Sequence, residues 1–290
     1  MKATQPKQAS RITNSTASEG RASLSSRWAL RTGTFSYLAL LLLIPLAVIL
    51  QDGLREGLGG LWYQISLPIA WHALKLTIWT AAVMTLINTV FGLLTAYVLV
   101  RYEFPGKTLL NSLVDIPLSI PTLVTGVMLV ILFGPQQTLG AWLDTTFGFT
   151  IIFAPPGIVL ALLFITFPFV VRAVQPVLER LDMAQEDAAA TLGAQSWKIF
   201  FRITLPPLIL PLSSGALLSF ARAIGEFGSI VIVAGNIPFY SQTAAVYLLG
   251  EVESENRLGA SALSILMVSI AFVLIMLVDW LQHHERRAAS

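Results

Sequence analysis

The sequence predicts an all-α protein, a polytopic membrane helical bundle with six transmembrane helices. Of its 290 residues, 55% are hydrophobic and 12% are charged, whereas soluble domains carry about 25% charged residues. The apolar residues lie in continuous runs. At about 1.5 Å per helical residue, these runs are long enough to cross a hydrocarbon core of about 30 Å. A membrane β-barrel would instead show short segments of alternating polarity, so we expect the runs to be helices.

Six such runs follow one another along the chain. The first is preceded by residues 1–34, a polar stretch rich in Ser, Thr, Lys and Arg. We expect this stretch to be a disordered cytoplasmic tail, although its composition also fits a plastid transit peptide. The six expected spans are Phe35–Leu50, Leu74–Val100, Leu113–Phe133, Gly157–Val174, Leu208–Val233 and Ala262–Leu281.

The positions of the basic residues predict the orientation of the bundle. With six spans, both termini lie on the same side of the membrane. Most of the 18 Lys and Arg residues fall on that side, which also holds the stretch 175–206, while Arg55, Lys75 and Arg257 fall on the other. Because cytoplasmic loops are enriched in Lys and Arg, both termini and the 175–206 loop are expected to be cytoplasmic. The net charge of +2 mostly reflects this topology and does not suggest nucleic-acid binding.

The polar stretch between the fourth and fifth spans favours two short helices joined at a glycine. Three consecutive alanines from Ala188 have high helix propensity, and Gly193 stands where a glycine commonly ends a helix. Ser196 can cap a second helix, and Pro206 with Pro207 would end it. Periodicity alone leaves a second interpretation open, a surface loop that only joins two spans.

The spacing within this stretch is that of a known motif. It resembles the coupling loop of the type-1, MetI-like permeases of bacterial ABC importers: Glu-Ala-Ala, three residues, Gly, nine residues, then Ile-x-Leu-Pro. The sequence departs from the pattern at Asp187, where the family usually has Glu. The resemblance implies a type-1 ABC importer permease fold and a loop that contacts a separate ATPase. The residues expected to couple this loop to the ATPase are Glu186, just before the motif, and the motif residues Asp187, Ala188, Ala189, Gly193, Ile203, Leu205 and Pro206.

Two charged residues lie within the expected fifth span. Arg222 and Glu226 are four positions apart, so in a continuous helix they would share one face. Charges inside a membrane are costly and often mark functional sites. Two compatible interpretations stay open: a structural ion pair, or a polar lining of an anion path in which Gly225 and Gly228 permit close helix contact.

The sequence around this pair is similar to one group of permeases. The stretch from Ala221 to Gly228, followed by Ala234 to Pro238, resembles the fifth-span signature of sulfate and molybdate permeases. Residues 241–262 resemble the CysT-type branch of sulfate and thiosulfate permeases more closely. The resemblance covers residues 35–281 and implies ATP-driven import of sulfate and thiosulfate. Molybdate or tungstate is the alternative cargo, and an ATP-independent secondary anion transporter is the alternative of another class.

The remaining polar residues suggest no catalysis. The sequence has no Gly-x4-Gly-Lys-Ser/Thr phosphate loop and no cysteine, so we expect a transport subunit that is not an enzyme and holds no cofactor or metal. Asp115 is expected to form a surface ion pair with Arg101 or Lys107, with a functional acid as the alternative. The acids Glu251, Glu253 and Glu255 are expected to form a solvated loop face, with a metal-ligand cluster as the alternative.

The resemblance also implies an assembly and a location. The expected partners are a second, related permease, two ATP-binding subunits that hold ATP and Mg, a periplasmic sulfate-binding protein, and membrane lipid. The expected location is the bacterial inner membrane with both termini cytoplasmic, and the plastid envelope is the alternative. We expect a tail at 1–34, a first helix with its external loop at 35–69, a permease core at 70–281 containing the coupling loop at 175–206, and a tail at 282–290.

The predicted topology can be tested with accessible tags in intact cells. Labelling by a membrane-impermeant reagent should separate two groups, because the basic residues are concentrated on one side. Tags near Gly57, Asp144 and Glu253 should be labelled from outside, and tags near Lys107, near Gln195 and after Arg287 should be protected. External labelling at Gln195 would contradict both the topology and the coupling role of the loop.

Overall fold

The computed structural model describes residues 24–288, and every element within that range is helical. The chain divides into two units, residues 1–50 and 51–290. The described part of the first unit belongs to α1 (Leu24–Gly53), a 30-residue helix that contains Pro45. This helix includes the expected first span. It also includes residues 24–34, which the sequence analysis placed in the tail, and the rest of that tail lies outside the described residues.

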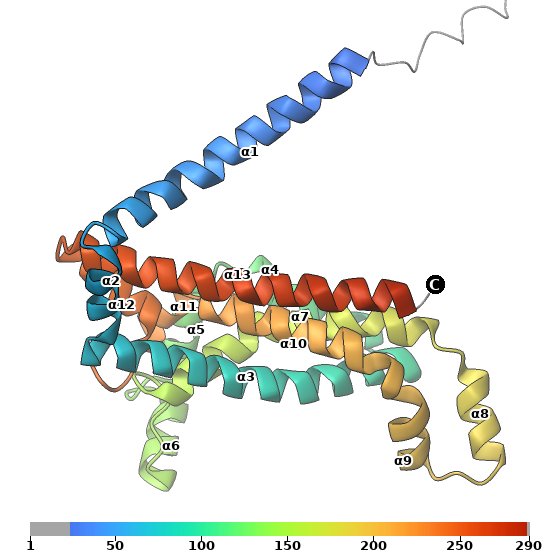
Figure 1. The fold of residues 1–290 in the computed structure, drawn as a ribbon. Helices are drawn as coiled ribbons and strands as arrows, with labels where there is room; N and C mark the ends of the chain where they lie inside the picture. Colours follow the sequence, from blue (N-terminus) through green and yellow to red (C-terminus); the bar gives the residue numbers. More distant parts are fainter. Residues whose placement is uncertain (1–23, 289–290) are drawn as a thin grey trace, which may run out of the picture. The chain divides into compact units, whose positions relative to one another are not determined.

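Four long helices form the centre of the second unit (Figure 1). They are α3 (Pro68–Arg101), α7 (Pro155–Arg180), α10 (Ile209–Ile224) and α13 (Arg257–Ala288), which lie side by side. One apolar cluster joins α3, α7 and α10 around Met84, Leu162 and Ile224. A second joins α3 and α7 near their C-terminal ends. The expected second, fourth and sixth spans are confirmed as continuous helices, and α13 continues into the stretch that was expected to be the C-terminal tail.

Buried polar side chains fix these helices against one another. The amide nitrogen of Asn88 on α3 donates to Thr166 Oγ1 on α7 over 2.9 Å, and to the carbonyl of Leu163 over 3.2 Å. The hydroxyl of Ser219 on α10 donates to the carbonyl of Thr166 over 3.0 Å. A polar group in hydrocarbon is costly unless it is bonded. These hydrogen bonds therefore fix the positions of α3, α7 and α10 along one another, in addition to the apolar contacts between them.

Several of the shorter helices lie at the two ends of the second unit (Figure 1). At one end lie α2 (Gly57–Ser66), α6 (Thr138–Phe147) and α12 (Ala244–Glu253). At the opposite end lie α8 (Met183–Thr191) and α9 (Ser196–Ile199), together with the C-terminal end of α13. The loop that carries the spaced motif thus projects from one end of the helical bundle.

The expected third span is not one continuous helix. It forms α4 (Lys107–Ser119) and α5 (Thr122–Phe133), which are bent by 109° relative to each other. Pro121 explains the break, because a proline disfavours helical geometry in the residue before it, and Ile120 is extended. Among the described residues, five helices are long and apolar enough to cross a membrane, or six if this bent pair counts as one span.

The expected fifth span is also interrupted. α10 ends at Ile224, and a separate short helix, α11 (Gly228–Val233), follows after three residues. α11 packs closely on α5. A Cβ on Gly126 would lie 2.8 Å from the carbonyl oxygen of Ser229, and one on Gly228 would lie 3.1 Å from the backbone nitrogen of Leu123. Side chains at these glycines would push the two helices apart. The glycines therefore allow α5 and α11 to pack closely.

Candidate functional site

The projecting loop begins with a capped helix. The side chain of Asp182 accepts a hydrogen bond of 2.9 Å from the backbone N–H of Ala184, which satisfies one of the free donors at the start of α8. The alanines from Ala188 then continue the helix to Thr191. The first of the two short helices is thus present, but it does not run from Glu179 to Leu192 as the sequence suggests, because Leu181 is extended and separates it from α7.

Gly193 ends α8 as the sequence predicts. Its φ is +83°, a left-handed conformation that side chains disfavour. Its N–H donates to the carbonyl of Ala190 over 2.9 Å, and the N–H of Ala194 donates to the carbonyl of Ala189 over 3.0 Å. These two bonds form a Schellman motif. The helix end is thus satisfied locally, and the chain reverses at the glycine without help from the rest of the bundle.

The second half of the loop differs from the expectation. Ser196 is the first residue of α9, and Gln195 holds the cap position, where its side chain accepts from Trp197 Nε1 over 2.7 Å. α9 passes into a π-helical turn, Phe200–Thr204, and then a 3-10 turn, Pro206–Leu208, that leads into α10. The two prolines therefore do not end the helical path. They stand at the start of the 3-10 turn, where a missing N–H costs little.

The loop exposes a group of apolar side chains. Leu192 is 88% exposed and Trp197 is 60% exposed, and Met183 and Phe201 are also exposed. Of the motif residues, Asp187, Ala188 and Pro206 are exposed, whereas Ala189, Ile203 and Leu205 are half-buried. An exposed apolar patch with a small-residue helix beside it is typical of a protein interaction site. The loop therefore offers a surface on which a partner can dock.

Glu186 lies differently from its neighbour Asp187. Its side chain is only 16% exposed and its Oε1 lies 2.7 Å from Nη2 of Arg101, the last residue of α3. The same oxygen accepts a hydrogen bond of 3.0 Å from Thr204 Oγ1. The structure thus separates two adjacent acids: Asp187, at the first motif position, is exposed, and Glu186, just before the motif, faces the bundle. Arg101 lies 85 positions from Glu186, and no local sequence pattern links it to the loop.

The charged pair of the fifth span lies at the break between α10 and α11. Arg222 Nη1 and Glu226 Oε2 are 2.8 Å apart, with side chains 36% and 2% exposed. Glu226 Oε1 also accepts from the backbone N–H of Ser229 over 2.9 Å and from its hydroxyl over 3.0 Å. The two residues meet as expected, but Glu226 lies beyond the helix end. Gly225 is exposed, so of the two glycines expected in close helix contacts, only Gly228 makes one.

Asp115 forms an ion pair that the sequence analysis did not predict. Its carboxylate accepts from Nε and Nη2 of Arg172 on α7, over 2.8 Å and 2.6 Å. The expected partners are engaged elsewhere, Arg101 with Glu186 and Lys107 with Glu103. Arg172 lies 57 positions from Asp115, and no local pattern links two residues that meet only because α4 packs on α7.

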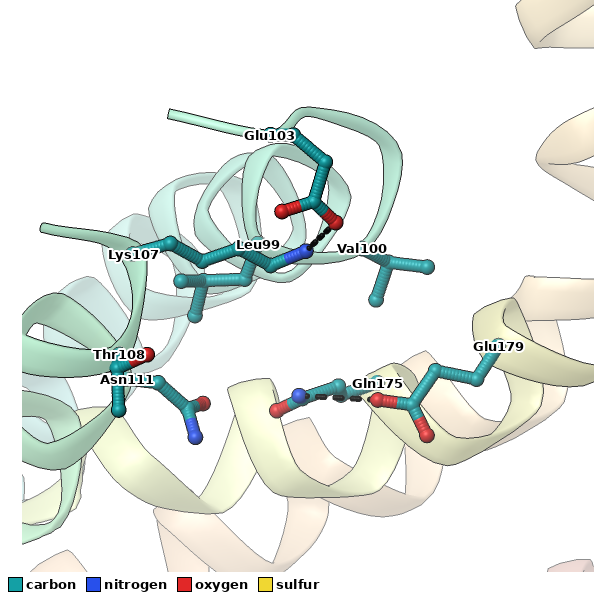
Figure 2. A pocket seen from close by; sticks show the side chains of 8 residues that line it. All are labelled: Leu99, Val100, Glu103, Lys107, Thr108, Asn111, Gln175 and Glu179. Atoms are coloured by element: carbon teal, nitrogen blue, oxygen red, sulfur yellow. Dashed lines mark hydrogen bonds and ion pairs between the residues drawn. The ribbon is translucent and has the colours of Figure 1, made fainter. Parts of the chain in front are cut away.

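A polar cavity of about 410 Å³ lies beside this ion pair, between the end of α3, the start of α4 and the end of α7. Figure 2 shows its lining side chains, with Lys107 bonded to Glu103 and Gln175 bonded to Glu179. The cation of this wall, Lys107, is therefore engaged by a carboxylate, and the polar side chains are largely bonded to one another.

Of the acids after the fifth span, Glu253 and Glu255 are exposed and Glu251 is half-buried. Glu251 accepts a hydrogen bond from the side chain of Asn256. Burial, followed by the hydrogen bond to Glu251, raises the pKa of Tyr247 in α12 well above its ordinary value. Among the described residues, no three His, Cys, Asp or Glu side chains are grouped closely enough to hold a metal ion. The side chains of His283 and His284 lie outside the described ones.

The fold and the projecting loop agree with a known family of membrane proteins. Residues 88–288 match the family described as "Binding-protein-dependent transport system inner membrane component". The chain belongs to this family. It is therefore a multi-pass membrane protein and the permease subunit of an ABC importer. It is the non-catalytic, cofactor-free component of a system in which a separate ATPase binds ATP.

Several relatives are similar over most of this permease. The sulfate transport system permease protein CysT of Synechocystis is 38% identical over 257 residues, which cover 89% of this chain and 90% of that protein. CysT of Escherichia coli K12 is 37% identical over 246 residues, covering 85% and 88%. The probable sulfate transport system permease protein cysT of Nephroselmis olivacea is 38% identical over 260 residues, covering 90% of both.

The fold is shared with a solved importer. A crystal structure of a bacterial ABC transporter involved in the import of the acidic polysaccharide alginate contains a chain with a TM-score of 0.72 to this permease. The sequence identity is 17%, and the match covers 91% of this chain and 96% of that one. At this identity the likeness shows the architecture, so the predicted type-1 importer fold is confirmed.

The glycine hinge of the loop can be tested by substitution. Gly193→Val places a branched side chain at φ +83°, which costs about 1–2 kcal/mol. We expect transport to fall while the subunit still inserts. Gly193→Asn is the matched control, because Asn adopts left-handed backbone more readily, and it should retain more activity. Equal uptake by the two variants, normalised to inserted subunit, would contradict a role for the hinge conformation.

Proposed function

We propose that this permease translocates sulfate into the cell, and thiosulfate with it. The observation that carries this proposal is the likeness to proteins named as sulfate permeases, at 37–38% identity over 85–90% of this chain. Sulfate and thiosulfate are tetrahedral dianions of similar size, so a path that admits one admits the other. Molybdate and tungstate have the same charge and shape, and they are the alternative cargo.

The proposed assembly has two permeases, two ATP-binding subunits and a periplasmic sulfate-binding protein, surrounded by membrane lipid. The family description, which names binding-protein-dependent transport, supports the binding protein. A relative in fold was crystallised as an alginate ABC transporter in complex with an alginate-bound periplasmic protein. We place the assembly in a bacterial inner membrane with both termini of this chain cytoplasmic.

The loop from Asp187 to Pro206 is the proposed contact with the ATPase. Its exposed face has the composition of a docking surface, with Leu192 and Trp197 at the tip. Its backbone is internally closed by the Asp182 cap and by the Schellman motif at Gly193. A loop held in this way moves as a rigid body and can transmit a movement of the ATPase to the helices. When the ATPase closes on ATP, the loop moves with it and tilts the helices that it joins.

The proposed role of Arg222 is to lower the barrier for the anion at the break in the fifth span. The Arg222 side chain is 36% exposed, whereas the Glu226 side chain that pairs with it is buried. A cation held by a buried carboxylate, with part of its surface accessible, can still attract a dianion. Gly225 leaves the backbone beside it uncovered by any side chain. The pair would thus combine the structural and the anion-path interpretations.

Uptake of radiolabelled sulfate by proteoliposomes tests the proposed function. The complete importer is expected to accumulate sulfate only with ATP inside and loaded binding protein outside, and unlabelled thiosulfate should compete. Competition by molybdate alone would change the cargo and keep the class. Accumulation in vesicles that lack the ATPase would instead support a secondary transporter and would contradict the proposal.

Substitutions at the charged pair separate its two roles. Arg222→Met leaves the carboxylate of Glu226 buried and unpaired, which typically costs about 3–5 kcal/mol, so assembly should suffer. Glu226→Gln should be milder, because its amide oxygen can still accept from Ser229 and Arg222, 36% exposed, can reach water. If Arg222 attracts the anion, the double variant assembles yet transports poorly. The measurement is sulfate uptake normalised to assembled complex, and full uptake by the double variant would leave only the structural pair.

A further inference from the structure

A three-membered polar cluster joins the coupling loop to the end of α3. Its members are Arg101, the last residue of α3, Glu186 in α8 and Thr204 in the π-helical turn. Oε1 of Glu186 lies 2.7 Å from Arg101 Nη2 and accepts from Thr204 Oγ1 over 3.0 Å. One oxygen atom therefore connects both halves of the loop to a helix that neither half adjoins in sequence.

The cluster is shielded from solvent. The side chains of Arg101 and Glu186 are 7% and 16% exposed, and Thr204 is 1% exposed. Exposed ion pairs contribute little, whereas removing one member of a shielded pair leaves the other charge uncompensated. The same end of the bundle offers a contrast, because the pair of Lys107 with Glu103 has side chains 27% and 87% exposed.

An aromatic contact supports the polar one. Tyr97 lies one turn before Arg101 on α3, and its ring centroid is 5.5 Å from that of Phe200 in an edge-to-face arrangement. Phe200 is the first residue of the π-helical turn that contains Thr204. The last turns of α3 therefore contact the first half of the loop through Arg101 and the second half through Tyr97.

At its other end, α3 reaches the opposite side of the bundle. Thr77 Oγ1 accepts the N–H of Ala244, the first residue of α12, over 2.8 Å. Between these ends, Asn88 bonds α3 to α7. α3 is one uninterrupted helix of 34 residues, so it physically connects the coupling loop with the segment before α12.

We propose that Arg101, Glu186 and Thr204 form a latch that positions the coupling loop on α3, so that the loop and the second span move as one body. This proposal rests on the proposed coupling function of the loop. Without the latch, the loop is held to the bundle mainly through the helices that flank it in sequence, α7 and α10. Glu186 is then a positioning residue that acts through α3, in contrast to the exposed Asp187 beside it.

Spin-label distances in the assembled importer test the latch directly. The chain has no cysteine, so Val98→Cys on α3 and Gln185→Cys on α8, both exposed, can be labelled alone. With the latch intact, the distance distribution should be narrow and equal in nucleotide-free and ATP-bound complexes. Glu186→Gln removes the charge at nearly constant shape, and Thr204→Val removes the hydroxyl. Each should broaden the distribution or shift it on ATP binding, and an unchanged narrow distribution in both would overturn the proposal.

A second measurement relates the latch to transport. In Glu186→Gln, sulfate imported per ATP hydrolysed should fall by roughly 2- to 30-fold, the range for changes that weaken coupling between sites, while the ATPase still copurifies. Glu103→Gln, in the exposed pair at the same end, is the matched control and should leave this ratio unchanged. Loss of ATPase binding in Glu186→Gln would overturn the latch, since it would place Glu186 in the docking surface. The label distances need no sulfate, so an incorrect cargo would leave the test of the latch valid.

Discussion

Peptide groups inside a membrane have no water to bond, so each interruption of a helix there requires a protein partner. That requirement shapes the broken third span and the interruption between α10 and α11. At the first break, Ile120 still donates its N–H to the carbonyl of Ile116, and Pro121 has no N–H to satisfy. At the second, the carboxylate of Glu226 takes the N–H of Ser229 at the start of α11. The carboxylate of Glu226, which would be costly in lipid, thus satisfies a backbone N–H that the break leaves without a helical partner.

The two breaks depend on each other. α5 and α11 each begin just after a break, and they contact through Gly126 and Gly228 with almost no space for a side chain. Because α5 and α11 pack this closely, each shields the backbone of the other, as neighbouring helices shield a long span. Arg222 lies beside this contact because it belongs to the last turn of α10.

The sequence predicts the long helices and the first half of the loop, and the reasons are local. Continuous apolar runs determine α3, α7 and α13, and a glycine after an alanine-rich helix predicts the turn at Gly193. The breaks were missed because apolar residues lie on both sides of each, although Pro121 was a signal for the first. The partners of Asp115 and Glu186 were missed for another reason. Arg172 and Arg101 are distant in sequence and reach these acids only through packing between helices.

The π-helical turn at Phe200–Thr204 has a geometric consequence for the loop. Its wider winding closes with the N–H of Leu205 donating to the carbonyl of Phe200, one residue farther back than in an α-helix. That extra residue sets the angle at which α9 leaves the axis of α10. Removal of one residue would restore ordinary winding and turn α9 by about 100° around that axis, carrying Trp197 to another side of the bundle. The spacing of nine residues between Gly193 and Ile203 therefore determines the rotation of α9 about the axis of α10. With this spacing, Thr204 reaches Glu186.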